Sequence, residues 1–236
     1  MPRKVRTFIA IILYLFVASW ALYAQSEDRY TQLTGISGFL SLLGGSLVNP
    51  KGVFSLLKSQ MDQSVLSNYG WLMTIGYSTL YAQTALILGL RGAEPAFKPF
   101  IPIPEKKYYL AQSGFTVPVG TAAIAAGFGV SFGFARVFGS DVNPVPLWAA
   151  FSTAMVAPTV ITMWLPETIA GLFAKNPTGS IPEGINNWRQ LIGLGWMIAL
   201  SCAASAFTAD MVWWQSIITG VVSTSVTCGV MILFLR

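Results

Sequence analysis

Residues 97–173 read FKPFIPIPEKKYYLAQSGFTVPVGTAAIAAGFGVSFGFARVFGSDVNPVPLWAAFSTAMVAPTVITMWLPETIAGLF. The first third of this stretch crowds prolines, lysines and tyrosines together, and two nearly uncharged runs follow it, at 116–137 and 146–165. An α-helix needs about twenty apolar residues to cross a hydrocarbon core of about 30 Å. The stretch therefore predicts a segment at the lipid interface that leads into two membrane spans.

The composition of the whole chain also indicates lipid as its main solvent. Charged residues make up 10% of the chain, whereas a soluble domain carries about 25%. The basic residues are dispersed between apolar runs and form no stripe, which argues against nucleic-acid binding and for cations that orient membrane spans. The chain has no histidine, the commonest metal ligand and general base, so we expect no metal site and no cofactor.

The N-terminal residues 1–24 allow two interpretations. A basic start at Arg3, Lys4 and Arg6 precedes an apolar run of residues 7–24, which fits either a signal peptide or a first membrane span. Residues 25–48 form a polar and then Gly-rich connection. Its second part is either a loosely packed surface segment or a short helix that lies against the spans.

A helix start follows at Asn49-Pro50, where Asn is a favourable cap and Pro suits the first helical position. An apolar stripe then recurs at helical spacing through Phe54, Leu57, Met61 and Val65. This pattern predicts an amphipathic helix in the plane of the interface. We interpret it as a surface anchor; the alternative is a helix that binds a partner.

Further apolar runs at 69–90, 190–208 and 211–235 complete a five-span membrane domain over residues 49–236. The fold class expected is an all-α, polytopic integral membrane helix bundle with a five-helix core, which has six spans if the N-terminal segment is retained. Residues 91–114 cannot cross, because prolines such as Pro102 and Pro104 deny them a helix. Tyr108 and Tyr109 suit the lipid boundary there.

Two features within the spans carry packing predictions. Ala125, Gly129 and Gly133 recur every four residues, which favours a close contact with another helix of the chain, with homodimerisation as the alternative. Pro158 interrupts the run at 146–165 and predicts a kinked helix rather than a cavity. Arg136 ends its span beside Gly139, as an interfacial cation able to pair with Asp141.

The orientation follows from the positive-inside bias. With six spans and the N-terminus inside, ten Lys and Arg residues fall on the cytoplasmic side and four on the far side. The arrangement places Lys106, Lys107, Lys175 and Arg189 in the cytoplasm. It places the Asn49-Pro50 helix on the outer face.

Several motifs, in this order, resemble the bacterial branch of the Yip family, the Ypt-interacting protein domain. They are Asn49-Pro50-Lys-Gly-Val-Phe54, Pro99-Phe-Ile-Pro102-Ile-Pro104-Glu-Lys-Lys-Tyr108-Tyr109, Phe134-Ala-Arg136-Val-Phe-Gly139, Ala157-Pro158 and Leu165-Pro166-Glu167. The resemblance implies a five-helix domain in a bacterial cytoplasmic membrane. It also implies that eukaryotic relatives bind Rab-type GTPases, but this chain has no long polar N-terminal region, so we expect the fold and not that partner.

No catalytic constellation of side chains stands out in the sequence. Its acidic residues Glu167, Asp210 and Asp141 fall at span ends, and no nucleophile accompanies a base. We therefore expect no enzyme, but a scaffold, partner-binding or membrane-organising subunit whose partners are the lipid bilayer and other membrane proteins. The alternative is a small-solute transporter or channel that uses the Pro158-kinked helix and the Ser/Thr-rich last span.

Overall fold

The computed structural model describes residues 35–59, 62–95, 102–176 and 181–235, and all the regular secondary structure within them is helical. The elements are α2 (Gly35–Val48), α3 (Pro50–Ser59), α4 (Gln63–Leu90), α5 (Glu105–Val137), α6 (Pro144–Thr159), the π-helical turn η2 (Val160–Trp164), α7 (Leu165–Phe173), α8 (Glu183–Thr208) and α9 (Trp213–Leu235). The predicted all-α class is confirmed for this part of the chain.

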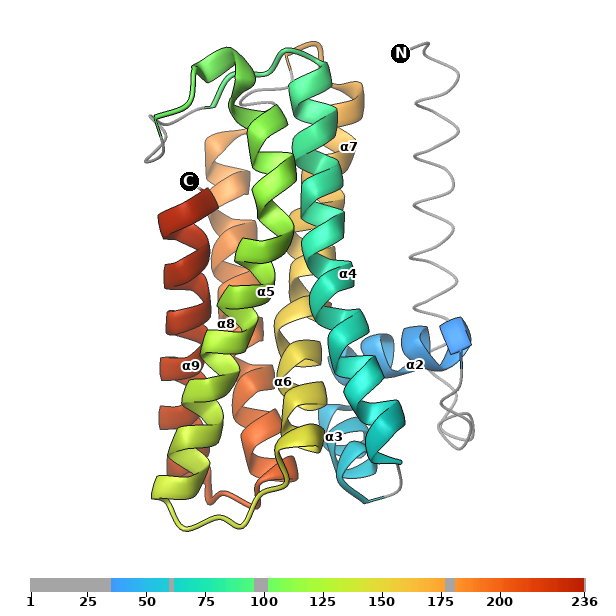
Figure 1. Ribbon diagram of the computed structural model, residues 1–236, viewed down its shortest axis with the longest axis vertical. Helices are drawn as coiled ribbons and strands as arrows, with labels where there is room; N and C mark the ends of the chain where they lie inside the picture. The colour runs from blue at the N-terminus through green and yellow to red at the C-terminus, as the bar shows by residue number, and fades with distance from the viewer. Residues whose placement is uncertain (1–34, 60–61, 96–101, 177–180, 236) are drawn as a thin grey trace.

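The long helices run side by side as a bundle, with α2 and α3 at one end (Figure 1). α6, η2 and α7 form one continuous rod that contacts α2, α3, α4, α5 and α8. In its most apolar window 83% of the residues are buried, against 28–39% in α5, α8 and α9. The rod is therefore the core of the bundle, and α9 packs outside it against α5 and α8.

Four helical segments in the described residues are long and apolar enough to cross a membrane: α5, the α6–η2–α7 rod, α8 and α9. They contain the predicted spans at 116–137, 146–165, 190–208 and 211–235. α4 contains the fifth, at 69–90, and packs against both α5 and the rod, but its Tyr, Gln, Ser and Thr residues leave it outside this apolar group. The N-terminal run at 7–24 lies outside the described residues.

The prediction that residues 91–114 form no helix is wrong in its second half. α5 begins at Glu105, directly after Pro104, and continues through Pro118. Prolines occur at Pro102 and Pro104 but not between Glu105 and Val117, so nothing in that stretch stops a helix. The helix therefore starts about 16 Å before the predicted span, at a rise of 1.5 Å per residue.

The Asn49-Pro50 helix is shorter and more deeply packed than predicted. The Asn49 Oδ1 accepts a hydrogen bond from the Gly52 amide at 3.0 Å, which confirms the cap, but α3 ends at Ser59 and Asp62 caps a new helix. Phe54 and Leu57 are fully buried, and α3 contacts α8, α6 and α2. The helix is thus part of the bundle rather than a peripheral anchor.

Residue Met61 of the predicted apolar stripe lies outside the described residues, and Val65 falls in α4. The segment before Asn49 is the short helix α2, with Leu42 and Leu43 buried. Of the two interpretations of the Gly-rich connection, the structure supports the helix that lies against the bundle.

The Ala125, Gly129 and Gly133 stripe does not make the predicted contact with any helix in the described part of the chain. All three residues are exposed, and a Cβ added at either glycine would meet no described atom within 4 Å. α5 packs instead through Gly120 and Gly127. A Cβ at Gly120 would collide with the Ser78 hydroxyl of α4, and one at Gly127 would lie 2.8 Å from a backbone carbonyl of α9.

Charged residues of the described part gather at the two ends of the bundle. Five cations lie at the end where α4 ends and α5 begins, namely Arg91, Lys106, Lys107, Lys175 and Arg189. Three lie at the opposite end, Lys51, Lys58 and Arg136. The end with more cations is the one that the positive-inside count places in the cytoplasm.

Candidate functional site at the π-helical turn

The central rod departs from α-helical geometry between two prolines. Pro158 lies near the end of α6 and Pro166 at the start of α7, and the five residues of η2 between them form a π-helical turn. The Leu165 amide donates to the carbonyl five residues back, that of Val160. In an α-helix the Thr162 carbonyl would accept from residue 166, which is a proline without an N–H. Pro166 therefore leaves the Thr162 carbonyl without its α-helical donor.

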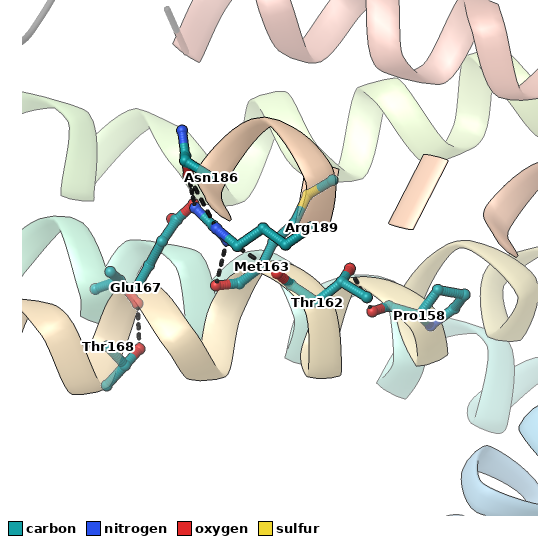
Figure 2. A network of polar contacts seen from close by, with 8 residues as sticks. Pro158, Thr162, Met163, Glu167, Thr168, Asn186 and Arg189 are labelled. Atoms are coloured by element: carbon teal, nitrogen blue, oxygen red, sulfur yellow. Dashed lines mark hydrogen bonds and ion pairs between the residues drawn. The ribbon is translucent and has the colours of Figure 1, made fainter. Parts of the chain in front are cut away.

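Arg189 of α8 supplies another donor (Figure 2). Its Nη1 donates to the Thr162 carbonyl at 2.9 Å and to the Met163 carbonyl at 3.3 Å. Its Nη2 donates to the Glu167 Oε1 at 2.7 Å, and its Nε donates to the Asn186 Oδ1 at 2.9 Å. All three guanidinium nitrogens are thus engaged, in a side chain that is only 12% exposed.

Hydroxyl and indole groups tie the same part of the rod to α4. The Thr168 and Thr84 hydroxyl oxygens lie 2.8 Å apart, and the Trp164 indole N–H donates to the Leu80 carbonyl at 3.0 Å. Within the rod, the Thr162 hydroxyl donates to the Pro158 carbonyl at 2.8 Å. The π-helical turn is therefore held from α8 on one side and from α4 on the other.

A second arginine satisfies carbonyls at the end of the rod. Arg91, the residue that follows α4, donates through Nη2 to the Ala174 carbonyl at 2.6 Å and through Nη1 to the Gly171 carbonyl. A helix end leaves its last carbonyls without intrahelical partners, and a cation there also interacts favourably with the helix dipole. Arg91 and Arg189 together connect α4 and α8 to the rod.

The contacts of this site hold α4 and α8 against the central rod, so the site acts as a structural brace. Its carboxylate, Glu167, is one-third exposed and is paired with Arg189. Each guanidinium nitrogen already donates to a protein oxygen, so the cation does not present a free face for a substrate. Among the described residues no three His, Cys, Asp or Glu side chains lie close enough together to hold a metal ion.

The structure brings together three of the residues that the sequence singled out, Pro158, Pro166 and Glu167. Pro158 does not produce a kink alone; the distortion is the π-helical turn between it and Pro166. Arg189 was predicted only as a cytoplasmic cation, and its contact with Glu167 was missed. The two lie 22 residues apart on different helices, and no sequence spacing relates them.

The other singled-out residues lie elsewhere. Pro102, Pro104, Tyr108 and Tyr109 are at the same end of the bundle as the network, before and within the first turn of α5. Tyr108 is buried, and its hydroxyl has no hydrogen-bond partner in the described structure, so it does not lie at an open boundary. Asn49, Pro50, Phe54, Arg136 and Gly139 are at the opposite end.

Several hydroxyl groups of α9 are hydrogen-bonded inside the bundle. The Ser223 hydroxyl donates to the Thr219 carbonyl at 2.6 Å, and the Thr227 hydroxyl donates to the Ser223 carbonyl at 3.0 Å. The Thr224 hydroxyl donates to Ser201 of α8 at 3.1 Å. These groups bond to helix carbonyls or across a helix pair, the usual use of Ser and Thr in apolar helices.

Comparison of the chain with known protein families, with curated proteins and with solved structures finds no match. The resemblance to the Yip family therefore has no support from these comparisons.

Proposed function

We propose that the chain is a multi-pass integral membrane protein with five spans in this domain, α4, α5, the rod, α8 and α9. The observation that carries the proposal is the separation of charge from apolar surface. Residues 63–90, 108–135, 144–166, 190–208 and 213–235 contain no Asp, Glu, Lys or Arg. Large apolar side chains are exposed on α4, α8 and α9, among them Leu72, Ile75, Leu86, Ile192, Ile217, Val221 and Ile232. A lipid core accommodates such a surface, and water does not.

Exposed tryptophans support the same placement. Trp71, Trp213 and Trp214 lie near one end of the bundle and Trp188 near the other, each 44–75% exposed. Tryptophan is enriched at both membrane interfaces because its ring is apolar and its N–H is polar. α9, from Trp213 to Leu235, is 23 residues long, or about 34 Å, which matches one crossing. α4 has 28 residues, a length of about 42 Å, and contains no charged residue, so we count it as the fifth span.

We place this domain in a cytoplasmic membrane of the bacterial type, with the end that carries Lys106 and Lys175 in the cytoplasm. Its role is that of a non-enzymatic scaffold that packs against other membrane proteins. The outward Ala125, Gly129 and Gly133 stripe supports this role, because small residues four apart let a second helix approach closely. Homodimerisation, the alternative at the level of sequence, and contact with a different chain both use such a face.

Site-directed crosslinking tests the role. In a chain whose native Cys202 and Cys228 are replaced by alanine, single cysteines are placed at Gly129, at Gly133 and, as the control, at the exposed Ile192 of α8. A bifunctional thiol reagent applied to native membranes should give adducts of higher mass from 129 and 133 and not from 192. A lone monomer at every position, or equal adducts at all three, would contradict the scaffold role.

A transporter or channel is the second candidate, and the π-helical turn in the central rod is the observation that favours it. Transporters place broken helices near the midplane, where freed carbonyls coordinate a solute. Here Arg189 donates to the Thr162 carbonyl that Pro166 frees, which favours the scaffold. Solute flux in proteoliposomes that Pro158→Ala abolishes, and that Pro118→Ala in α5 leaves intact, would reverse the ranking.

A further inference from the structure

A polar cleft lies at the end of the bundle opposite the Arg189 network. It has a volume of about 480 Å³ and is formed by the turn after α5, the turn between α8 and α9, and the ends of α3 and α4 that face them. Ligand sites in proteins commonly enclose about 300–1,000 Å³. The cleft is therefore large enough for one small polar group.

Charges of both signs line this cleft. Lys58 of α3 donates to the Asp210 carboxylate, and Asp141 on the facing loop lies 3.0 Å from the Arg136 Nη1. Both aspartates are thus paired with a cation, so the charges of Lys58, Arg136, Asp141 and Asp210 balance. The carboxylates of Asp210 and Asp141 are 79% and fully exposed, so both remain accessible to a ligand.

These ion-paired groups keep capacity for a ligand. A lysine ammonium has three donors, and an ionised carboxylate has about four acceptor sites. The Lys58–Asp210 pair uses one of each. Amide side chains also line the cleft: Asn143 donates to Gln63 at 3.0 Å, and the Gln215 Oε1 accepts from the Val212 amide at 3.3 Å.

The cleft lies at the depth of lipid headgroups if the proposed membrane placement holds. Asp210 precedes the exposed Trp213 and Trp214 at the start of α9, and tryptophans mark this depth. Phe138, which lines the cleft, packs edge to face against Trp214 with ring centroids 5.4 Å apart. The cleft therefore adjoins the level at which phosphodiester and amine groups of lipids are found.

We propose that this cleft binds a phosphoethanolamine group, a phosphodiester beside a primary ammonium. Lys58 donates to the phosphate, and the Asp210 and Asp141 carboxylates accept from the ammonium. The same group occurs in phosphatidylethanolamine and in soluble glycerophosphoethanolamine. A choline headgroup has no N–H to donate to these carboxylates, and a glycerol headgroup has no ammonium at all.

Native mass spectrometry of the full chain in detergent tests the proposal. The chain is mixed with phosphatidylethanolamine, phosphatidylcholine or phosphatidylglycerol of equal acyl composition. We expect about tenfold stronger retention of phosphatidylethanolamine, the effect of one hydrogen bond to a charged group. Glycerophosphoethanolamine in a parallel sample distinguishes the sources: displacement of the lipid shows that the headgroup alone suffices, and persistence shows that the acyl chains contribute to a lipid site.

Two variants and a control link the preference to the cleft. Asp210→Asn should abolish it, and asparagine tolerates the left-handed backbone of this position (φ 52°). Lys58→Gln should weaken retention, whereas Glu183→Gln, the same charge change at the opposite end, should leave it unchanged. Equal retention of the three lipids, or a loss in Glu183→Gln equal to that in Asp210→Asn, would overturn the site. Such a result in a chain that still requires detergent for extraction would leave the proposed membrane placement intact.

Discussion

Removal of the Arg189 side chain should destabilise the bundle more than removal of any exposed arginine. Arg189→Ala removes the donor of the Thr162 carbonyl, whose α-helical partner would be Pro166, a contact to the Met163 carbonyl, and the partner of the Glu167 carboxylate. An unsatisfied buried carbonyl costs about 1–3 kcal/mol. The loss of the Glu167 ion pair adds less than a fully buried pair would, because that carboxylate is one-third exposed. We expect a total loss of about 3 kcal/mol in the free energy of unfolding.

The loss can be measured by unfolding the purified chain in mixed micelles with increasing mole fraction of dodecyl sulfate, followed by circular dichroism. Arg136→Ala is the matched control. Its ion pair with Asp141 joins two exposed side chains, and exposed pairs contribute about 0–1 kcal/mol. If Arg189→Ala unfolds within about 0.5 kcal/mol of the unmodified chain, the brace interpretation is refuted.

A second variant tests the reason for the loss. Pro166→Ala restores a backbone N–H that can donate to the Thr162 carbonyl. In that background Arg189→Ala should cost about 1 kcal/mol less, since one carbonyl regains a donor. A double-mutant cycle measures this coupling directly. Strictly additive losses would show that Arg189 does not act through the carbonyl that Pro166 frees.

Three further predictions follow from the fold. Gly127→Ala should destabilise the chain by about 1–3 kcal/mol, because the added Cβ would overlap α9. Gly129→Ala should be neutral or stabilising, because the space around Gly129 is open. Thermal unfolding of the two variants measures the difference in stability. Hydrogen bonds from Ser64 hold the pKa of the Asp62 carboxyl below its usual value. The ionised carboxylate therefore stabilises the fold above about pH 4, and this stabilisation is lost as the pH falls through the lowered pKa. Asp62→Asn should flatten the acid side of a plot of stability against pH, and an unchanged plot would contradict the role of Asp62 as a helix cap. Cysteines at Lys106 and Lys175 should react with an impermeant maleimide from the same side of the membrane, and labelling from opposite sides would contradict the five-span topology.

The lengths of the uncharged runs, together with the capping and turn residues at their ends, were sufficient to predict the order of the long helices. Uncharged runs of membrane length cannot leave their backbone groups unpaired in lipid, so they must be helical. The ends followed from local signals: Asn49 caps α3, and Gly139 ends α5 with φ 80°, a conformation that glycine adopts without steric cost. The start of α5 was misjudged, because the prolines up to Pro104 were taken to exclude a helix for ten residues beyond them.

Only the tertiary structure decided which face of each helix points inward. α5 carries small residues on both sides, so the sequence pattern at Gly129 and Gly133 could not be told from the one at Gly120 and Gly127 that packs inside. In a soluble helix polar residues mark the outer face. Lipid accepts apolar side chains on every face, so the periodicity of apolar residues no longer shows which face points inward. The Arg189 network depends on the same information: its contact with Glu167 exists only because α8 packs beside the π-helical turn with that face toward it.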